Sequence, residues 1–455
     1  MIQSKFHFTS ALTSAGWQRD VLVSVDETGM IAGVEAKAEA KGSQAIPGIA
    51  IPALANVHSH AHQRLMVGLA ERAGPGADSF WTWRDVMYGF ALKLSPDDLE
   101  AVAAQAYVEM LKAGFSCVGE FQYLHHQPDG SPYDEPAEMS LRCLSAAEQA
   151  GIGITMLPTL YTYSGFGGQP PTVGQRRFVN GAVRFLQIYE TLTSVTAASP
   201  LRRLGISPHS LRAVTPELLN QVLGGIGADA RVHIHVAEQV KEVEDCLAWC
   251  GKRPVEVMRS EFDVSDRWCA IHATHMTDEE TLWLAGSGAV AGLCPTTEAN
   301  LGDGIFSAGQ FMAQGGAIAI GSDSQITISP AEDLRMLEYS QRLRDRTRNA
   351  LASGAGASTG RSLFEATLRG GSQCLDQPMG AIEVGRRCDI AVLDGNDPRL
   401  IGREGDQALD AWIFSAGNMA VKDVIVGGTH VVRERRHFDG DRIQKRFRET
   451  VRRLS

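Results

Sequence analysis

Residues 49–60 read IAIPALANVHSH, an apolar run that closes on two histidines. A β-strand turns residues i and i+2 to the same face, so His58 and His60 can point together at one metal ion. Imidazole nitrogen suits Zn(II) and Fe(II). The stretch therefore predicts a buried strand that ends in part of a divalent metal site.

Three further fragments also close short apolar runs: HIHVAE at 233–238, IH at 271–272 and GSD at 321–323. His235 and Asp323 would complete a mixed shell with His58 and His60 and could leave a position open for water, which indicates catalysis. An HxH pair alone arises by chance, but four fragments in this order favour one site. His233 lies two residues deeper in its strand, so we expect interior packing there.

Short β-like runs alternate with helix-compatible segments from residue 51 to about 375, as in βα units with a parallel sheet. Helix signals lie between them: SPDDLE at 95–100 predicts a helix start, and KAG at 112–114 its end. Every candidate metal ligand or acid/base residue falls at or just past the C-terminal end of a predicted strand, which is where barrel enzymes carry their catalytic residues. We therefore predict an α/β fold, a (β/α)8 TIM barrel, with strands at 49–57, 116–121, 153–160, 203–207, 232–236, 268–272, 289–294 and 317–321.

The two chain ends carry a different pattern. Residues 20–26 and 31–34 alternate around a turn and predict a β-hairpin, and residues 389–393 and 424–432 look similar. We expect both ends to build one small β-sandwich domain. The expected divisions are residues 1–50 and 379–455 for that domain and its tail, and 51–378 for the barrel.

The composition of the chain indicates which classes of binding partner and which cellular location to expect. Lys and Arg number 43 against 53 Asp and Glu, for a net charge of −10, which disfavours nucleic acid or an anionic membrane as a partner. The eight cysteines include no CxxC pair, so reduced thiols are expected. No signal-peptide core or 18-residue apolar stretch is found, which predicts a soluble cytoplasmic protein. A homodimer remains open.

The order of the motifs resembles the amidohydrolase superfamily, in its deaminase branch with a single metal. The shared features are HxH after strand one, HxxE at strand five, His after strand six and Asp after strand eight. CPTTEANLG at 294–302 and GAIEVGRRCD at 380–389 are similar to further family segments. Within the branch, HSHAHQR at 58–64 and WTWR at 81–84 look most like the formimidoylglutamate deiminase family. That family converts N-formimidoyl-L-glutamate and water to N-formyl-L-glutamate and ammonia in histidine degradation.

The resemblance also bears on the number of metal ions. Binuclear relatives usually carry a bridging carboxylated Lys after strand four, whereas this chain has ISPH at 206–209. We therefore expect one divalent ion, held by His58, His60, His235 and Asp323. Zn(II) is the first expectation, with Fe(II) possible because the same shell suits both.

Roles for the remaining residues follow from the resemblance and from the chemistry of an amidine. Asp323 would accept a proton from the attacking water, Glu238 would shuttle protons to the substrate nitrogens, and His272 would polarise the water. A substrate with two carboxylates needs cations or several donors where it is buried. The expected substrate contacts are Gln63, Arg84, Tyr123, His209 and Arg212.

Three alternatives remain from the sequence. A deaminase of the same branch could act on guanine, cytosine or a thiolated adenosine, although a purine pocket would want aromatic and amide contacts in place of two arginines. A noncatalytic scaffold is disfavoured because the whole set of metal and acid/base residues is present. Hydrolysis on the amino-acid side would release formamide and glutamate, and the sequence does not separate it from ammonia release.

Overall fold

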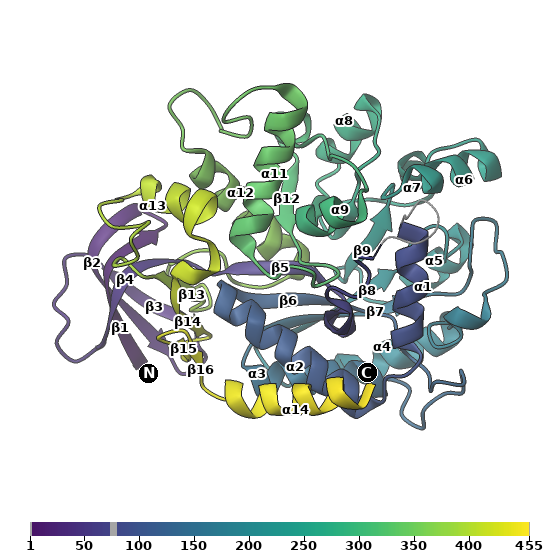
Figure 1. Ribbon diagram of the computed structural model, residues 1–455, viewed down its shortest axis with the longest axis horizontal. Coiled ribbons are helices and arrows are strands. Elements are labelled where there is room, and N and C mark those ends of the chain that lie inside the picture. The colour runs from purple at the N-terminus through teal and green to yellow at the C-terminus, as the bar shows by residue number, and fades with distance from the viewer. Residues whose placement is uncertain (1, 73–79, 455) are drawn as a thin grey trace.

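The computed structural model describes residues 2–72 and 80–454 and contains a parallel barrel (Figure 1). Eight strands pair in chain order from β5 to β12. A bridge between Ser59 and Asp323 joins the first and last strands, which closes the sheet. The strands are β5 Leu54–Ser59, β6 Phe115–Gln122, β7 Gly153–Leu160, β8 Arg202–Pro208, β9 Arg231–Val236, β10 Trp268–His272, β11 Val290–Leu293 and β12 Ala317–Ile320.

Helices follow the barrel strands and cover the outside of the sheet (Figure 1). The predicted start at Ser95 is confirmed, because its side chain caps α2 together with Asp98, and Gly114 ends the helix with φ 103°. The helices are α1 Phe80–Ala91, α2 Pro96–Ala113, α3 Glu138–Ala150, α4 Ala182–Ala197, α5 Pro216–Leu223, α6 Val240–Cys250, α7 Pro254–Glu261, α8 Asp278–Gly286, α9 Pro295–Leu301, α10 Ala308–Ala313, α11 Pro330–Asp345 and α12 Thr359–Leu375.

Both chain ends build a second, mixed sheet of eight strands beside the barrel, in the order β16-β15-β14-β13-β4-β1-β2-β3. The predicted hairpin is confirmed by the antiparallel pair β2 and β3. The sheet has its own apolar core, with Phe8, Val23 and Ile390 completely buried. Its strands are β1 Ile2–Thr13, β2 Gly16–Asp26, β3 Ile31–Glu35, β4 Gln44–Pro52, β13 Ile390–Leu393, β14 Val421–Val426, β15 Thr429–Arg433 and β16 Arg436–His437.

The first predicted barrel strand, residues 49–57, is in fact parts of two strands. β4 ends at Pro52 and belongs to the mixed sheet, whereas β5 begins at Leu54 and belongs to the barrel. All residues from 50 to 57 are buried, so the apolar run carries no break where the chain passes from one sheet to the other. The prediction of a single strand was therefore wrong.

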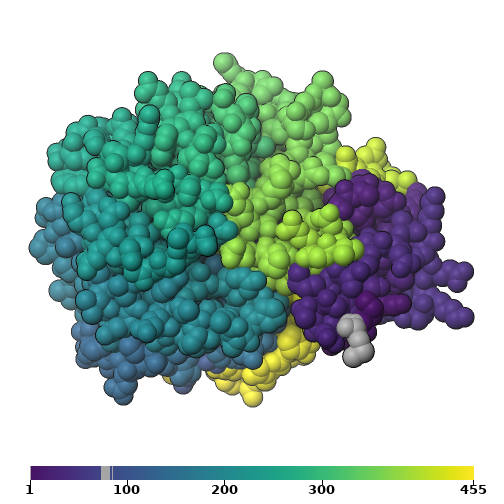
Figure 2. Space-filling model, turned by 180° about the vertical axis from the view of Figure 1, so that it is seen from behind, coloured from purple at the N-terminus to yellow at the C-terminus, as the bar shows by residue number. Residues whose placement is uncertain are grey.

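The end segments are joined to the barrel by ion pairs. The C-terminal helix α14, Gly440–Leu454, lies along α2, where Arg453 pairs with Asp98 and Arg446 with Glu100. From behind, the N-terminal strands form the lobe beside the barrel (Figure 2). The short helix α13, Asp406–Ala411, contacts this lobe through the bond from Trp17 to Asp406. None of these contacts involves the carboxyl ends of strands β5 to β12, which together form what we call the barrel mouth.

Candidate active site

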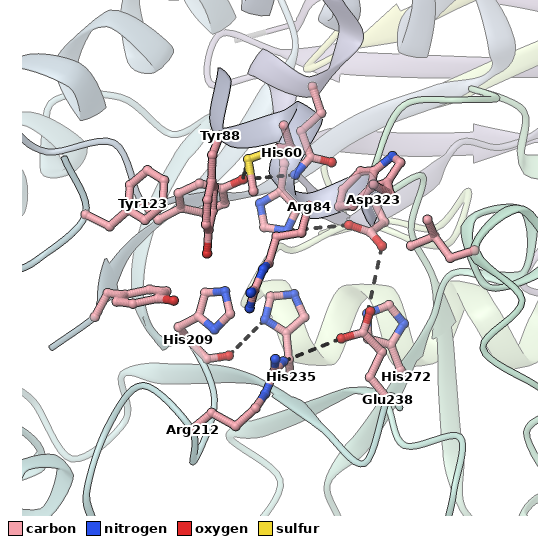
Figure 3. Close-up of a pocket in the computed structure, with 16 residues that line it drawn as sticks. His60, Arg84, Tyr88, Tyr123, His209, Arg212, His235, Glu238, His272 and Asp323 are labelled. Carbon is pink, nitrogen blue, oxygen red and sulfur yellow. Dashed lines mark hydrogen bonds and ion pairs between the residues drawn. The ribbon is translucent and has the colours of Figure 1, made fainter. Parts of the chain in front are cut away.

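Four side chains from three strand ends converge at the barrel mouth, and Figure 3 shows three of them. His58 lies in β5, His60 directly after it, His235 in β9 and Asp323 just past β12. The Nε2 atoms of His58 and His235 are 3.0 Å apart. Asp323 Oδ1 lies 3.4 Å from the Nε2 atoms of both His58 and His60. The predicted metal ligands therefore form one buried cluster.

The outer ring nitrogens show how this cluster is held. Nδ1 of His60 lies 2.9 Å from the Phe121 carbonyl oxygen, and Nδ1 of His235 lies 2.8 Å from the His209 carbonyl oxygen. A carbonyl oxygen only accepts, so both Nδ1 atoms carry the proton and both Nε2 atoms keep a lone pair. Burial lowers the pKa of these imidazoles, that of His58 to about 3. Neutral imidazoles facing a carboxylate fit a divalent cation.

The backbone brings β5 and β12 unusually close at this point. A Cβ on Gly321 would lie 2.8 Å from the Cβ and backbone nitrogen of His58, so only glycine fits there. The Asp323 amide donates to the His58 carbonyl oxygen at 2.9 Å, and the His60 amide donates to the Asp323 carbonyl oxygen at 3.1 Å. The seam of the barrel thus sets the ligand separations.

Glu238 and His272 lie beside the cluster, Glu238 two residues past the end of β9 and His272 as the last residue of β10. His272 Nε2 is 3.8 Å from Glu238 Oε1 and 3.8 Å from Asp323 Oδ2. Burial raises the pKa of Glu238 to about 7, against the opposing effect of His272 and Arg212. Burial would lower the pKa of His272, but the carboxylates of Glu238, Glu298 and Asp323 raise it to about 10. A carboxyl group that titrates near neutrality next to a cation can exchange protons at neutral pH.

The five predicted substrate contacts line the same pocket, and Figure 3 shows Arg84, Tyr123, His209 and Arg212 among them. Arg84 extends from α1, with its guanidinium carbon 5.5 Å from the centre of the Tyr88 ring. Arg212 follows β8 and lies 3.7 Å from Glu238 Oε2, with 11% of its side chain exposed. Gln63 donates to the Tyr123 hydroxyl at 2.9 Å. His209 packs against Tyr161 with ring centres 4.6 Å apart.

Known proteins that resemble this chain were identified by family and by sequence identity. A family model described as the amidohydrolase family matches residues 49–431. The chain belongs to the amidohydrolase family. A formimidoylglutamate deiminase from Pseudomonas aeruginosa is 50% identical over 437 residues, which span 96% of each chain.

Solved amidohydrolase-like structures share the architecture. An amidohydrolase from Brucella melitensis superposes with a TM-score of 0.94 at 47% identity, covering 99% of this chain and 100% of that one. An adenosine deaminase from Xanthomonas campestris with bound zinc has a TM-score of 0.84 at 20% identity, covering 100% and 98% of the two chains. The second likeness is one of fold alone. Within the described part of this amidohydrolase, no helix is long and apolar enough to span a membrane.

Several pocket residues of this amidohydrolase were not predicted from its sequence. Tyr161 directly follows β7, so the rule that chemistry lies at strand ends could have found it. The others lie on helices or in loops, where no sequence period points to a barrel mouth. Trp83 lines the pocket, whereas the side chain of Trp81, from the same motif, lies outside the described residues. The additional lining residues are Trp83, Met87, Tyr88, Tyr161, Phe178 and Leu301.

Proposed function

We propose that this amidohydrolase hydrolyses N-formimidoyl-L-glutamate to N-formyl-L-glutamate and ammonia, as a step of histidine degradation. The observation that carries the proposal is the 50% identity, over 96% of the chain, with the Pseudomonas aeruginosa formimidoylglutamate deiminase. The pocket chemistry supports it, because two arginines face a cluster suited to a cation. The substrate class is thus a small amidine that carries carboxylates.

His58, His60, His235 and Asp323 would hold one divalent ion, Zn(II) in our proposal. When bound, such an ion would lower the pKa of a water molecule toward about 7 and so supply the nucleophile. The imidazoles of His60 and His235 keep their Nε2 lone pairs turned inward because their outer nitrogens are anchored on carbonyl oxygens. Asp323 would both hold the ion and accept the proton of the attacking water.

Glu238 would move protons between water and substrate. It lies within 4 Å of His272 and of Arg212, and its pKa of about 7 allows both protonation states at neutral pH. Water adds to the formimidoyl carbon, and its first proton passes by way of Asp323 and Glu238 to the terminal nitrogen. The remaining hydroxyl proton follows by the same two residues as the C=O bond forms and the C–N bond breaks, so that the nitrogen leaves as ammonia. His272, positively charged beside three carboxylates, would stabilise the oxygen added to that carbon.

Arg84 and Arg212 would bind the two carboxylates of the glutamate part. Guanidinium and carboxylate form forked pairs of hydrogen bonds, which fix direction as well as charge. Tyr123, Gln63 and His209 offer further polar atoms in the same pocket. Burial lowers the pKa of His209 well below its usual value, so its ring is neutral and can accept or donate one hydrogen bond.

The deciding experiment is ammonia release by metal-loaded protein from N-formimidoyl-L-glutamate, with guanine and cytosine as parallel substrates. Total metal per chain is measured on the same sample, and formamide is assayed beside ammonia. We expect rapid ammonia release from the first substrate alone, about one Zn(II) per chain and no formamide. Release only from a nucleobase would overturn the proposed substrate, and formamide in place of ammonia would overturn the proposed bond cleavage.

A further inference from the structure

Behind His272 stands a buried carboxylate to which the mechanism above gives no role. Glu298 lies in α9, directly after β11, and 5% of it is exposed. Its Oε1 lies 3.2 Å from Nδ1 of His272 and also accepts a hydrogen bond from the Cys294 amide at 2.8 Å. The other ring nitrogen, Nε2, faces Glu238 and Asp323. The His272 ring therefore lies between Glu298 and the pocket.

A simple helix cap would not explain the charge at this position. The bond from the Cys294 amide satisfies one free donor at the start of α9, which a neutral side chain could also do. A second acidic residue is in direct contact, because the Asp303 amide donates to the Glu298 carbonyl oxygen at 2.9 Å. Burial, Glu238 and Glu298 together raise the pKa of Asp303 to about 9, so the local field already disfavours negative charge. The contact with His272 offsets that cost.

The backbone at His272 does not choose which ring nitrogen enters the pocket. His272 ends β10 with φ 67°, and Ala273 follows with φ 50°. These angles direct the Cβ toward the mouth, but the outer torsion of a histidine is broad and nearly two-fold, so the ring can turn over. A fixed acceptor at one edge of the ring removes this freedom.

We propose that Glu298 is a positioning residue for the reaction given under Proposed function, on which this inference rests. Its Oε1 accepts the Nδ1–H of His272 and holds the ring with Nε2 toward Glu238 and Asp323. Glu298 touches neither substrate nor metal ligand in this role. It acts through His272 alone, and the hydrogen bond is what fixes the ring.

Two variants separate the hydrogen bond from the charge. E298Q keeps an oxygen that can accept from both His272 and the Cys294 amide, whereas E298L has a similar size and no acceptor. We expect E298L to lower kcat by about 10- to 100-fold with little change in KM, since loss of an orienting partner has effects of that size. E298Q should retain most of the wild-type kcat. Metal content should match wild type in both.

Glu280 offers a matched control. It is also 5% exposed, caps the start of α8 through the Thr277 amide, and does not line the pocket. E280L should lower the melting temperature without lowering the kcat of the folded protein. If E298L fails to fold, E298A removes the same acceptor with room for a water molecule at the Cys294 amide.

A crystal structure of E298L or E298A tests the inference without relying on the substrate. We expect the His272 ring to turn so that Nε2 no longer lies between Glu238 and Asp323. An unmoved ring would overturn the inference, as would equal losses of kcat in E298Q and E298L. If wild-type protein releases no ammonia from N-formimidoyl-L-glutamate but the ring turns, the proposed function fails and the positioning role stands.

Discussion

Polar side chains are buried at both ends of the barrel, but their contacts differ between the two ends. At the mouth, the Nε2 atoms of His58 and His235 lie 3.0 Å apart, and those of His58 and His60 lie 3.4 Å from Asp323. At the opposite end, polar groups pair with protein partners. Arg387 donates from Nε to Oδ1 and from Nη2 to Oδ2 of Asp389, a forked ion pair with 1% and 0% of the two side chains exposed. The Thr155 hydroxyl donates to the Leu375 carbonyl oxygen at 2.7 Å.

β9 contains both situations within three residues. His235 Nε2 faces another imidazole, whereas His233 Nε2 lies 2.9 Å from the Cys374 carbonyl oxygen at the end of α12. Both residues are buried and on one face of one strand. Depth along the strand is therefore what separates a candidate ligand from a structural residue. Substitutions at the two ends of the barrel should differ accordingly.

The largest effect is expected from His235→Ala at the mouth. Loss of one of four ligands should release most of the metal and lower kcat/KM by several orders of magnitude, because the nucleophile depends on the ion. Metal per chain after gel filtration and ammonia release are measured together. Full metal content and activity in this variant would remove His235 from the ligand set and weaken the distinction between the two histidines.

Glu238→Gln should come next. The amide keeps the shape but cannot take up a proton, so we expect kcat to fall by about 10²–10⁴-fold, the size of a general acid/base contribution. Metal content should stay at the wild-type level, because Glu238 is not among the proposed ligands. The measurement is steady-state ammonia release with metal analysis of the same sample. Unchanged kcat would take Glu238 out of the mechanism.

Arg84→Met should affect binding more than chemistry. Removing one partner of a buried charged pair costs about 2–5 kcal/mol, so kcat/KM for N-formimidoyl-L-glutamate should fall, mostly through KM. A truncated amidine without carboxylates, such as formamidine, should be hydrolysed as by wild type. Arg231→Met is the matched control, since Arg231 pairs with Asp376 at the start of β9, away from the mouth. Equal losses on both substrates would make Arg84 structural.

Much of this arrangement follows from short-range rules. The i, i+2 spacing of His58 and His60, and the position of Asp323 directly after an apolar run, predict side chains at one barrel end. The passage from β4 to β5 could not be predicted, because Pro52 and Leu54 belong to one unbroken apolar stretch.

Contacts made by helices and loops were also beyond the sequence. Tyr88 and Phe178 line the pocket from segments with no strand period. Glu298 was recognised within a family segment, but its role depends on a contact across 26 residues with His272. Such contacts are set by tertiary packing, so they cannot be predicted from the spacing of residues along the sequence.

The smallest effect is expected from His233→Leu, the deeper histidine of β9. The change leaves the Cys374 carbonyl oxygen without this donor, which costs about 1–3 kcal/mol of folding free energy. Part of that loss should be recovered, because His233 Nδ1 is buried and has no hydrogen-bond partner among the described residues. Denaturant unfolding measures the net change, and metal content and kcat of the folded variant should equal wild type. A drop in bound metal would show that the two histidines act together and that depth along the strand does not separate their roles.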